Sequence, residues 1–403
     1  MNKKISLINV EDALNIVLNE AVKFGTEEID FKESSGRVLR ENIMADREMP
    51  PFNRVSMDGI AIKTSSFESG RRDFKIENVQ AAGSEQLTLT NDEHCLEAMT
   101  GAMLPVGADA VIPYELINIE NGSARINMES VIYFQNIHKK GLDRKLNDVL
   151  IPINTKISAA EIGVLATVGK TRVQVAVLPK IAIISTGDEL VEVNELPAPY
   201  QIRKSNVHTL HSLLKRFEIK ADLFHINDSK EQLRQKINSL LEEYDVLMFS
   251  GAVSKGKFDF IPEILDELGV IKLFHKVRQR PGKPFWFGKK DQTTIFAYPG
   301  NPVSTFISCL KYFVPWLHKS LELSFENRNF AILAEDFYFK PELTCFLQVR
   351  IVNQEGKLMA FPKVGNGSGD LANLTENDGF LELPFDRTEF KKGENFPLIQ
   401  YRY

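Results

Sequence analysis

The sequence predicts a multidomain α/β protein, with a parallel-sheet domain between segments that are rich in β structure. The chain has 403 residues, more than one hydrophobic core normally holds. From about residue 179 to residue 321, short apolar runs alternate with amphipathic helical segments, which is typical of a parallel sheet covered on both faces. On both sides of this segment, strand-like runs and turns dominate. We therefore expect several domains of different fold class.

The first 25 residues predict one amphipathic helix. Four apolar side chains recur at helical spacing and share one face of it: Ala13, Ile16, Val17 and Ala21. The same stretch is not expected to be a signal peptide, because polar residues interrupt its apolar run.

The segments that flank the central domain predict β structure. Residues 46 to 145 contain strand-like runs, such as FKIENV and ADAVIPY, separated by turns. Residues 147–169 predict a strand, a turn and a helix. Residues 321–403 alternate apolar and polar side chains in the way that a small β-barrel does.

In the central domain, apolar runs predict buried strands and the amphipathic segments between them predict helices. The runs are KIAIIST, ADLFHI and DVLMFSG. Ligands of such folds bind at the carboxyl ends of the strands. Four chemically rich segments lie at or near those ends: Ser185–Glu189, Asn227–Asp228, Ser250–Asp259 and the region 281–302. We therefore predict a binding site at one edge of the sheet.

Two proline-bounded turns, PGKP at 281–284 and PGNP at 299–302, predict an anion site. Proline fixes φ and glycine supplies a positive φ, so that both turns present backbone N–H groups in a preset geometry. Lys283 lies inside the first turn, and an apolar helix-like run follows the second. Preset amides, a lysine and a helix start together favour anions. Two ordinary tight turns are the alternative.

Charged side chains near the strand ends extend this prediction. Asp228 and Asp259 end what we expect to be neighbouring strands, so both could bind one Mg²⁺ or polarise one water. Lys276, Arg280 and Lys283 lie close together in the sequence and form a cluster suited to phosphate-sized anions.

Three further motifs allow more than one interpretation. The carboxylates of Asp188 and Glu189 could bind magnesium, hold a ribose or cap the next helix. Asp58 and Gly59 form an MDG turn, which is either a hairpin turn or part of a site. Thr100 precedes a glycine at the end of a strand-like run, where a hydroxyl suits a phosphate or oxyanion. His208 and His211 share a helix face, but nothing nearby completes a metal shell, so we expect them to be structural.

Composition excludes several classes of protein. The net charge of −5 argues against general nucleic-acid binding. No run approaches 18 apolar residues, so no membrane span is expected. Cys95, Cys309 and Cys345 lie far apart without a CxxC motif, which argues against a zinc ribbon or a disulfide framework and suits a reducing compartment. We expect a cytoplasmic protein.

Seven motifs together resemble the MoeA family, the molybdopterin molybdenumtransferases. In chain order they are MPPFNRVSMDGIAI, MTGAMLPVGADAVI, STGDEL, SGAVSKGKFDF, PGKPFWFG, YPGNPVS and GNGSGDL, and the resemblance covers nearly the whole chain. It implies an N-terminal helix in 1–25 packed on an α/β molybdopterin-binding domain at 178–320. It also implies a linker and dimerisation domain from 26–45 with 147–177, a β-rich domain at 46–146 and a C-terminal β-barrel at 321–403.

The resemblance further implies a reaction and an assembly. The reaction would insert molybdate into adenylylated molybdopterin with Mg²⁺, releasing AMP and molybdenum cofactor. The protein would be a homodimer whose cleft lies between the α/β domain of one subunit and the β-rich domain of the other. Transient contacts with a molybdopterin adenylyltransferase and with molybdoenzymes would follow. A non-catalytic molybdopterin carrier and an adenylyltransferase are the alternatives.

Carried over to this sequence, the resemblance implies three groups of site residues. The catalytic residues would be Asp58, Thr100, Asp143, Glu189, Asp228 and Asp259, of which Asp228 and Asp259 would also bind the metal. The substrate-binding residues would be Ser185, Thr186, Gly187, Ser250, Gly251, Ser254, Lys276, Arg280, Lys283, Pro299, Asn301, Pro302 and Ser368.

The sequence departs from the family pattern at several charged positions. His138 replaces an arginine, and Leu142 replaces a glutamate. In the loop after the third apolar run, Ala252, Lys255 and Lys257 replace a glycine, an apolar residue and an acidic residue. Three further replacements are Lys204 for an aspartate and Leu343 and Gln348 for arginines. Either the anion contacts are redistributed, which we favour, or the chain is a paralogue with altered activity.

Overall fold

The computed structural model describes residues 7–251, 260–323 and 329–402. It divides into two compact units, which we describe separately. The first consists of Met1–Glu41, Asn154–Ile162 and Arg172–Tyr403, and the second of Asn42–Ile153 and Gly163–Thr171. The first contains a sheet with helices on both faces and a β-barrel, and the second is mainly β structure. This organisation confirms the predicted fold class.

The central sheet of the first unit has six strands in the order β16-β13-β17-β21-β20-β18. Their bounds are Ile181–Thr186 (β13), Ala221–Ile226 (β16), Val246–Ser250 (β17), Ile271–His275 (β18), Trp286–Lys290 (β20) and Thr293–Tyr298 (β21). We expected a wholly parallel sheet, but β20 is antiparallel to both of its neighbours. The reason is a two-residue turn between β20 and β21, at which Asp291 adopts a φ of 53°.

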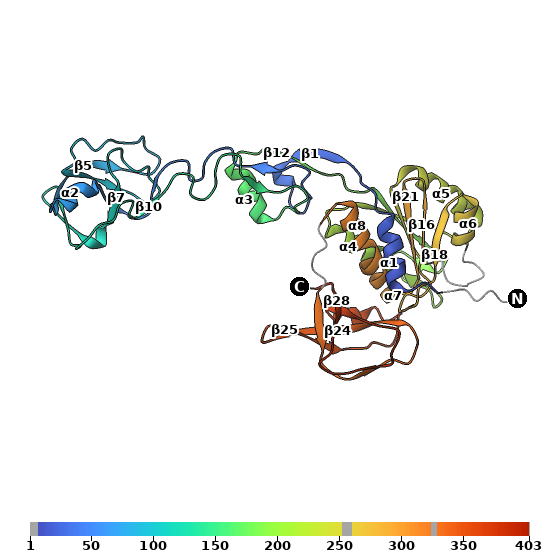
Figure 1. Ribbon diagram of the computed structural model, residues 1–403. Coiled ribbons are helices and arrows are strands. Elements are labelled where there is room, and N and C mark those ends of the chain that lie inside the picture. Colours follow the sequence, from blue (N-terminus) through green and yellow to red (C-terminus); the bar gives the residue numbers. More distant parts are fainter. Residues whose placement is uncertain (1–6, 252–259, 324–328, 403) are drawn as a thin grey trace. The chain divides into compact units, whose positions relative to one another are not determined.

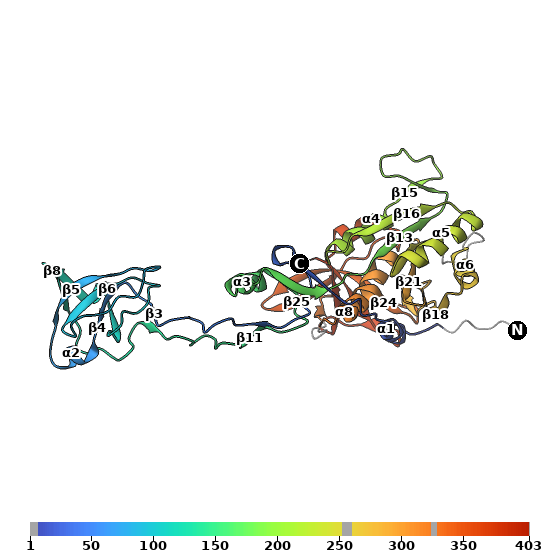
Figure 2. The ribbon, with the colours of Figure 1, turned by 90° about the horizontal axis from the view of Figure 1, so that it is seen from above.

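Helices cover both faces of this sheet, as predicted (Figures 1 and 2). One face packs against α1, α4, α7 and α8, and the other against α5 and α6. Their bounds are Val10–Asn19 (α1), Asn206–Lys215 (α4), Lys230–Glu243 (α5), Ile261–Glu267 (α6), Pro302–Ser308 (α7) and Val314–Ser320 (α8), and the π-helical segment Cys309–Phe313 joins the last two.

The N-terminal helix is shorter than predicted. Ala13 and Val17 are fully buried, which confirms the predicted face, but the helix ends at Asn19. Beyond Asn19, side chains of α8 form hydrogen bonds with the backbone groups that would otherwise bond within another turn of the helix. The Trp316 indole donates to the Glu20 carbonyl at 2.9 Å, and the Val22 N–H donates to the Ser320 hydroxyl at 3.1 Å. These tertiary contacts hold residues 20 to 24 outside the helix.

The order of the strands creates a switch point in the sheet. Strand β13 is first in the chain, and β16 and β17 pair with its opposite edges. The prediction that Asp228 and Asp259 follow neighbouring strands is therefore wrong, because β13 lies between β16 and β17. Ligands of open α/β sheets bind where the strand order reverses in this way. A ligand site is therefore expected at the carboxyl ends of β13 and β17.

The C-terminal region of the first unit forms a closed five-stranded barrel, which confirms the β-barrel prediction. Its strands follow the order β24-β25-β22-β28-β26, and pairing of β24 with β26 closes it. The bounds are Phe330–Leu333 (β22), Thr344–Gln354 (β24), Lys357–Pro362 (β25), Gly379–Leu383 (β26) and Asn395–Gln400 (β28). The short strand β19 (Gln279–Arg280) pairs in parallel with the start of β24, so the chain before the PGKP turn is joined to the barrel.

Short strand pairs complete the first unit, and a second sheet forms most of the other. The pairs are β1 (Thr26–Asp30) with β12 (Arg172–Ala176), β14 (Leu190–Val191) with β15 (Ile202–Arg203), and β23 (Phe337–Tyr338) with β27 (Glu389–Phe390). The main sheet of the second unit has the strand order β7-β4-β6-β5-β9-β8. Its strands are Gly59–Ile62 (β4), Asp73–Gln80 (β5), His94–Ala98 (β6), Ala110–Pro113 (β7), Ile117–Glu120 (β8) and Ser123–Ile126 (β9). It also contains α2 (Thr64–Glu68) and the pairs β3 (Arg54–Val55) with β10 (Ile137–His138) and β2 (Ile43–Met44) with β11 (Val149–Ile151). Helix α3 spans Ala159–Thr167.

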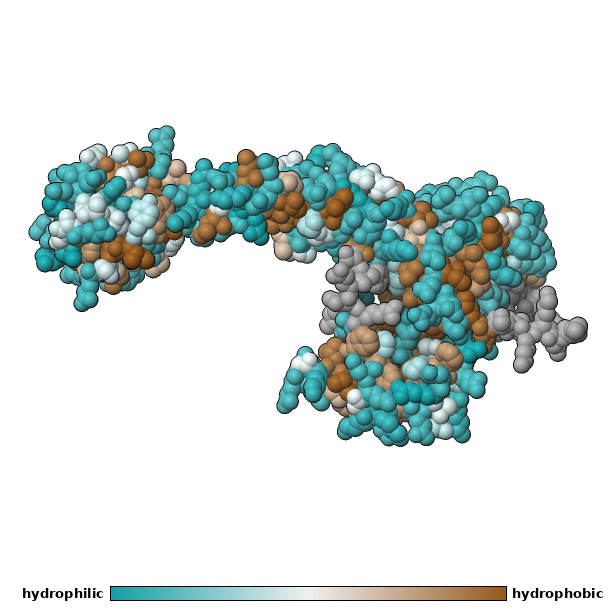
Figure 3. All heavy atoms as spheres, viewed as in Figure 1, coloured by the Kyte–Doolittle hydropathy of each residue, from teal (hydrophilic) through white to brown (hydrophobic). Residues whose placement is uncertain are grey.

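Hydrophobic side chains are largely withdrawn into these cores. The face drawn in Figure 3 is mostly hydrophilic, with hydrophobic residues in smaller patches. Within the three ranges that the structure describes, no helix has the length and apolarity that a membrane span requires.

Candidate functional site

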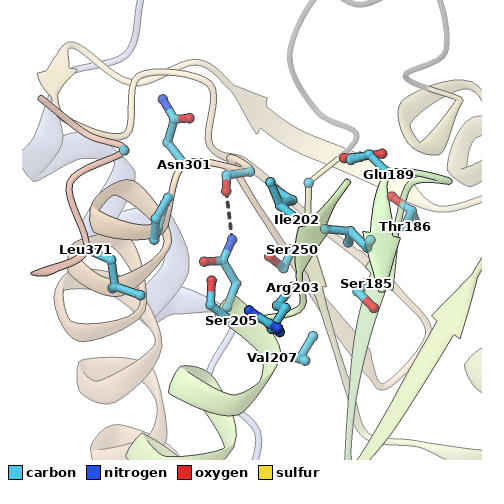
Figure 4. A pocket seen from close by; sticks show the side chains of 16 residues that line it. Ser185, Thr186, Glu189, Ile202, Arg203, Ser205, Val207, Ser250, Asn301 and Leu371 are labelled. Carbon is cyan, nitrogen blue, oxygen red and sulfur yellow. Dashed lines mark hydrogen bonds between the residues drawn. The ribbon is translucent and has the colours of Figure 1, made fainter. Parts of the chain in front are cut away.

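A pocket of about 390 Å³ lies at the switch point of the central sheet (Figure 4). Ser185 and Thr186, at the end of β13, line it together with Ser250 and Gly251 from the end of β17. The start of α4, the PGNP turn and the barrel segment around Leu371 complete the lining. We name this cavity the strand-end pocket. It brings together many of the predicted residues, namely Ser185, Thr186, Glu189, Ser250, Gly251, Asn301 and Pro302.

Two glycines allow the chain to turn away at the ends of these strands. Gly187 has a φ of 125°, and a Cβ on it would lie 2.3 Å from the Glu189 carboxylate. Gly251 has a φ of 104°. Since L side chains rarely adopt such angles, glycine is required at both strand ends. The buried hydroxyls of Ser185, Thr186 and Ser250 therefore sit directly before sharp turns.

Polar groups from α4 and the PGNP turn form another side of the strand-end pocket. The Asn206 amide donates to the Gly300 carbonyl at 2.7 Å, drawn as a dashed line in Figure 4. Its Oδ1 atom is buried and has no partner among the residues that the structure describes. The sequence prediction missed both Asn206 and the pocket-lining Arg203. The signal for Asn206 was its place in KSNV, where a polar pair precedes an amphipathic helix.

Carboxylates gather beside this pocket. Glu189 lines it, and Asp188 accepts a hydrogen bond from the Asp228 N–H at 3.1 Å. The loops after β13 and β16 are thereby joined. Asp259 lies outside the described residues, as do Ser254, Ala252, Lys255 and Lys257. Within the described ranges, no group of three or more His, Cys, Asp or Glu side chains could hold a metal ion, and this includes the His208 and His211 pair.

A second polar cluster lies on the neighbouring strand β16. The His225 Nδ1 atom is 3.0 Å from the Ser185 hydroxyl. Burial, reinforced by the charge of Lys204, lowers the pKa of His225, so this ring is neutral near pH 7. Lys204 itself is only 8% exposed and forms an ion pair with Glu192. Its hydrogen bond and charge lower the pKa of Glu192, so the charge of Lys204 is neutralised locally.

A larger pocket, of about 810 Å³, lies between the PGKP turn and the barrel. Its charged lining residues are Arg280, Lys283 and Lys340, and its described lining contains no aspartate or glutamate. We name it the cationic pocket. The predicted residues Pro299, Asn301 and Ser368 also line it, whereas Lys276 lines neither this pocket nor the strand-end pocket.

A buried network holds the PGKP turn in place. The Tyr312 hydroxyl donates to the Gln279 side-chain carbonyl, and the Gln279 amide donates to the Pro281 carbonyl at 3.1 Å. Gly282 has a φ of 94°, and a Cβ on it would lie 2.5 Å from the Gln279 amide nitrogen. The turn therefore packs too closely for any other residue at this position.

The two pockets meet at one hydrogen bond. Asn301 lines both pockets, and its amide donates to the Ser368 hydroxyl at 2.7 Å. The Val303 N–H donates to the Ser368 carbonyl at 3.1 Å. A barrel loop is thus attached to the PGNP turn at the boundary between the pockets.

The remaining predicted residues belong to the second compact unit. Asp58 accepts a hydrogen bond from the Thr100 N–H at 2.6 Å, and this bond, with one from the Thr100 side chain, lowers the pKa of Asp58. Asp58 and Gly59 do not form a hairpin turn, because β4 pairs with β6 and β7 and not with β3. A Cβ on Gly59 would lie 1.9 Å from the Ile112 carbonyl oxygen, so close strand packing requires glycine here.

His138 is also in this second unit. Its Nε2 atom is 2.8 Å from the carboxylate of Asp143, which the resemblance implied to be catalytic. Leu142 is 63% exposed.

Comparison with known proteins finds a family model for each of three segments of the chain. Residues 8–169 match the family described as "MoeA N-terminal region (domain I and II)" and residues 182–319 the "Probable molybdopterin binding domain". Residues 331–401 match the "MoeA C-terminal region (domain IV)".

Whole proteins give the same assignment. A molybdopterin molybdenumtransferase of Synechocystis is 39% identical over 98% of this chain and 100% of its own length. A Staphylococcus epidermidis protein of that name is 30% identical over 98% of this chain and 96% of its own. The crystal structure of the molybdopterin biosynthesis moeA protein from Pyrococcus horikoshii superimposes with a TM-score of 0.82 at 26% identity, covering 98% of this chain and 100% of that one. The chain therefore belongs to the MoeA family, the molybdopterin molybdenumtransferases.

Proposed function

We propose that this protein is an enzyme that inserts molybdate into adenylylated molybdopterin and releases AMP and molybdenum cofactor. One observation carries the proposal. A pocket with hydroxyls and a carboxylate at the switch point meets a cation-lined pocket at the Asn301–Ser368 hydrogen bond. Two adjoining pockets of this kind suit a phosphate-bearing organic substrate in the first and a small oxyanion in the second, when the two must react with each other. The names of the relatives add support.

The strand-end pocket is the proposed site of the pterin substrate. The hydroxyls of Ser185, Thr186 and Ser250 would donate hydrogen bonds to phosphate oxygens. The glycines at 187 and 251 would allow the ligand to approach the backbone closely. The side chain of Glu189 would act on the leaving nucleotide, and the PGNP turn would form the wall.

Magnesium is the proposed cofactor. Carboxylate oxygens are the ligands that Mg²⁺ prefers, and Asp228 lies at the edge of the sheet beside Asp188. Asp228 and Asp259 would hold the ion, which would neutralise charge on the phosphates. The described residues supply only one of these two carboxylates.

The cationic pocket is the proposed site of molybdate. Arg280, directly before the PGKP turn, and Lys283, within it, are both exposed and have no ion-pair partner among the residues described. Both are therefore available to a dianion. Lys276 would steer anions from outside the pocket.

A homodimer in the cytoplasm is the proposed assembly, in which Asp58, Thr100 and Asp143 complete the site of the other subunit. The linker and dimerisation domain would be formed by 26–45 with 147–177. Mixing Asp58→Ala and Asp228→Ala protomers should restore part of the activity through hybrid dimers. No recovery in verified heterodimers would mean that each site is built within one chain.

The reaction is tested by incubating the protein with adenylylated molybdopterin, molybdate and Mg²⁺ and following AMP. We expect AMP to appear only when molybdate and the divalent ion are both present. Consumption of ATP with pterin adenylylation, independent of molybdate, would support an adenylyltransferase instead. Tight pterin binding without any AMP would support a carrier.

A further inference from the structure

We propose that Lys340, on the barrel side of the cationic pocket, is a binding residue for a tetrahedral dianionic oxyanion, which it holds together with Arg280 and Lys283. This inference rests on the proposed function and names a residue that neither the sequence motifs nor the family resemblance indicated. It assigns one wall of the molybdate site to the barrel.

The charge of the pocket is the first argument. Arg280 and Lys283 come from the segment before and within the PGKP turn, and Lys340 comes from the chain between β23 and β24. None of the three has a carboxylate within ion-pair distance in the described part of the chain. The buried thiol of Cys345 also lines the pocket, but burial raises its pKa to about 12, so it carries no charge near pH 7. All the charged side chains in the described lining are therefore cationic.

Two uncharged residues of the barrel also line this pocket. They are Leu343 and Gln348, at positions where the family resemblance implies arginines. The side-chain carbonyl of Gln348 accepts from the Asn373 amide at 3.1 Å, which leaves the Gln348 amide nitrogen as a neutral donor. Lys340, three residues before Leu343, supplies a positive charge to the same wall. The guanidinium of an arginine combines a positive charge with several hydrogen-bond donors. Here Lys340 supplies the charge and the Gln348 amide supplies a neutral donor.

The origin of the cations in two separate segments suits an oxyanion. A tetrahedral anion offers oxygens in several directions, so that cations from both segments can each contact it. At about 810 Å³, the pocket is much larger than a bare oxyanion, so charge and not close fit selects the ligand. Molybdate and inorganic phosphate share this chemistry and are the two probes.

Equilibrium dialysis of the full-length protein at low ionic strength tests the inference, with molybdate and phosphate in separate arms. We expect Lys340→Ala to weaken molybdate binding by about three- to tenfold and Lys340→Arg to bind nearly as the unmodified protein does. Lys357→Ala is the matched control, because Lys357 is an exposed barrel lysine that lines neither pocket. Adding Leu343→Arg to Lys340→Ala should recover most of the affinity.

The outcomes separate the inference from the proposed function. Equal affinities for Lys340→Ala and the unmodified protein would overturn the role of Lys340 and leave the proposed function intact. No recovery on adding Leu343→Arg in a folded double variant would instead contradict the placement of position 343 beside the same anion. Failure of the unmodified protein to bind either anion would contradict the proposed molybdate site as well. Weakening in the molybdate arm alone identifies molybdate as the ligand, and equal weakening in both arms identifies a general oxyanion site.

Discussion

The strand-end pocket and the cationic pocket share one residue, Asn301, and differ in almost everything else. The first is lined by hydroxyls, amides, Arg203 and Glu189, and it lies where the order of a sheet reverses. The second is larger, has only cations among its described charged lining residues, and lies where a barrel meets a proline turn. Charges of both signs in a lining suit catalysis on a bound substrate, whereas charges of positive sign alone suit capture of an anion. Under the proposed function, capture of the anion and chemistry on the pterin substrate therefore have separate places in this unit.

The largest effect is expected for a substitution in the strand-end pocket, which should change catalysis and not the binding of molybdate. Glu189 is the only carboxylate in its described lining. We expect Glu189→Gln to lower kcat by roughly 100- to 1000-fold, because a charge placed beside the reacting groups is lost. Molybdate binding should stay within about twofold, since Glu189 does not line the cationic pocket. Asp266→Asn, an exposed carboxylate of α6, is the control. A parallel loss of molybdate binding would show that the two pockets are one site.

Low pH should affect both pockets together, because it lowers the stability of the folded core and does not act on the residues that line either pocket. Burial, with the charge of Lys156, lowers the pKa of His318 to about 4, whereas an unfolded histidine has a pKa near 6.5. The unfolded chain therefore binds a proton between these values and the folded chain does not. We expect stability to be complete above pH 6.5 and to fall by about 3 kcal/mol as the pH drops to 4.

Thermal melting between pH 7.5 and 4 measures this effect. In His318→Gln the pH slope should be smaller, although the edge-on contact of the ring with Phe217 is lost as well. An unchanged slope would place the acid sensitivity elsewhere. If only one pocket loses its ligand at low pH, its own groups are responsible.

A smaller effect is expected for a substitution in the cationic pocket, which should change the KM for molybdate and not kcat. We expect Lys283→Ala to raise the KM for molybdate by about tenfold, because one charge-assisted contact is lost, and to leave kcat nearly unchanged. The effect should shrink at high salt. Lys272→Ala removes an exposed lysine of β18 that lines neither pocket and serves as the control. A large fall in kcat instead would give Lys283 a part in the chemistry.

The smallest effect concerns the boundary between the pockets. Ser368→Ala removes the acceptor of the Asn301 amide, a hydrogen bond worth about 1 kcal/mol. We expect two- to fivefold increases in both KM values. A double-mutant cycle with Asn301→Ala should show non-additive effects, because the two residues form one contact. Strict additivity would mean that Asn301 serves each pocket independently.

The regular parts of the central sheet could be predicted from the sequence. Apolar runs such as KIAIIST marked the buried strands, and their ends correctly located Ser185 and Ser250 in one pocket. The strand order could not be read this way, because periodicity does not show which edge of β13 each later strand joins. Hence Asp228 and Asp259 were wrongly expected on neighbouring strands.

Residues that depend on tertiary contacts were also missed. The end of α1 is set by Trp316 and Ser320, nearly 300 residues away, and no local signal at Asn19 marks it. Lys340 is an isolated lysine in the sequence, and only the folded structure places it in the same pocket lining as Arg280.

The pairing of β19 with β24 has a consequence for folding cooperativity. Gln279 and Arg280 lie opposite Thr344 and Cys345, so the residues that lead into the PGKP turn are a strand of the barrel sheet. Local opening of the barrel edge therefore releases the turn as well, and native-state hydrogen exchange should report one shared opening free energy for these amides. An anion bound to the turn would slow that exchange, so the barrel is stabilised by a ligand that most of its strands never touch.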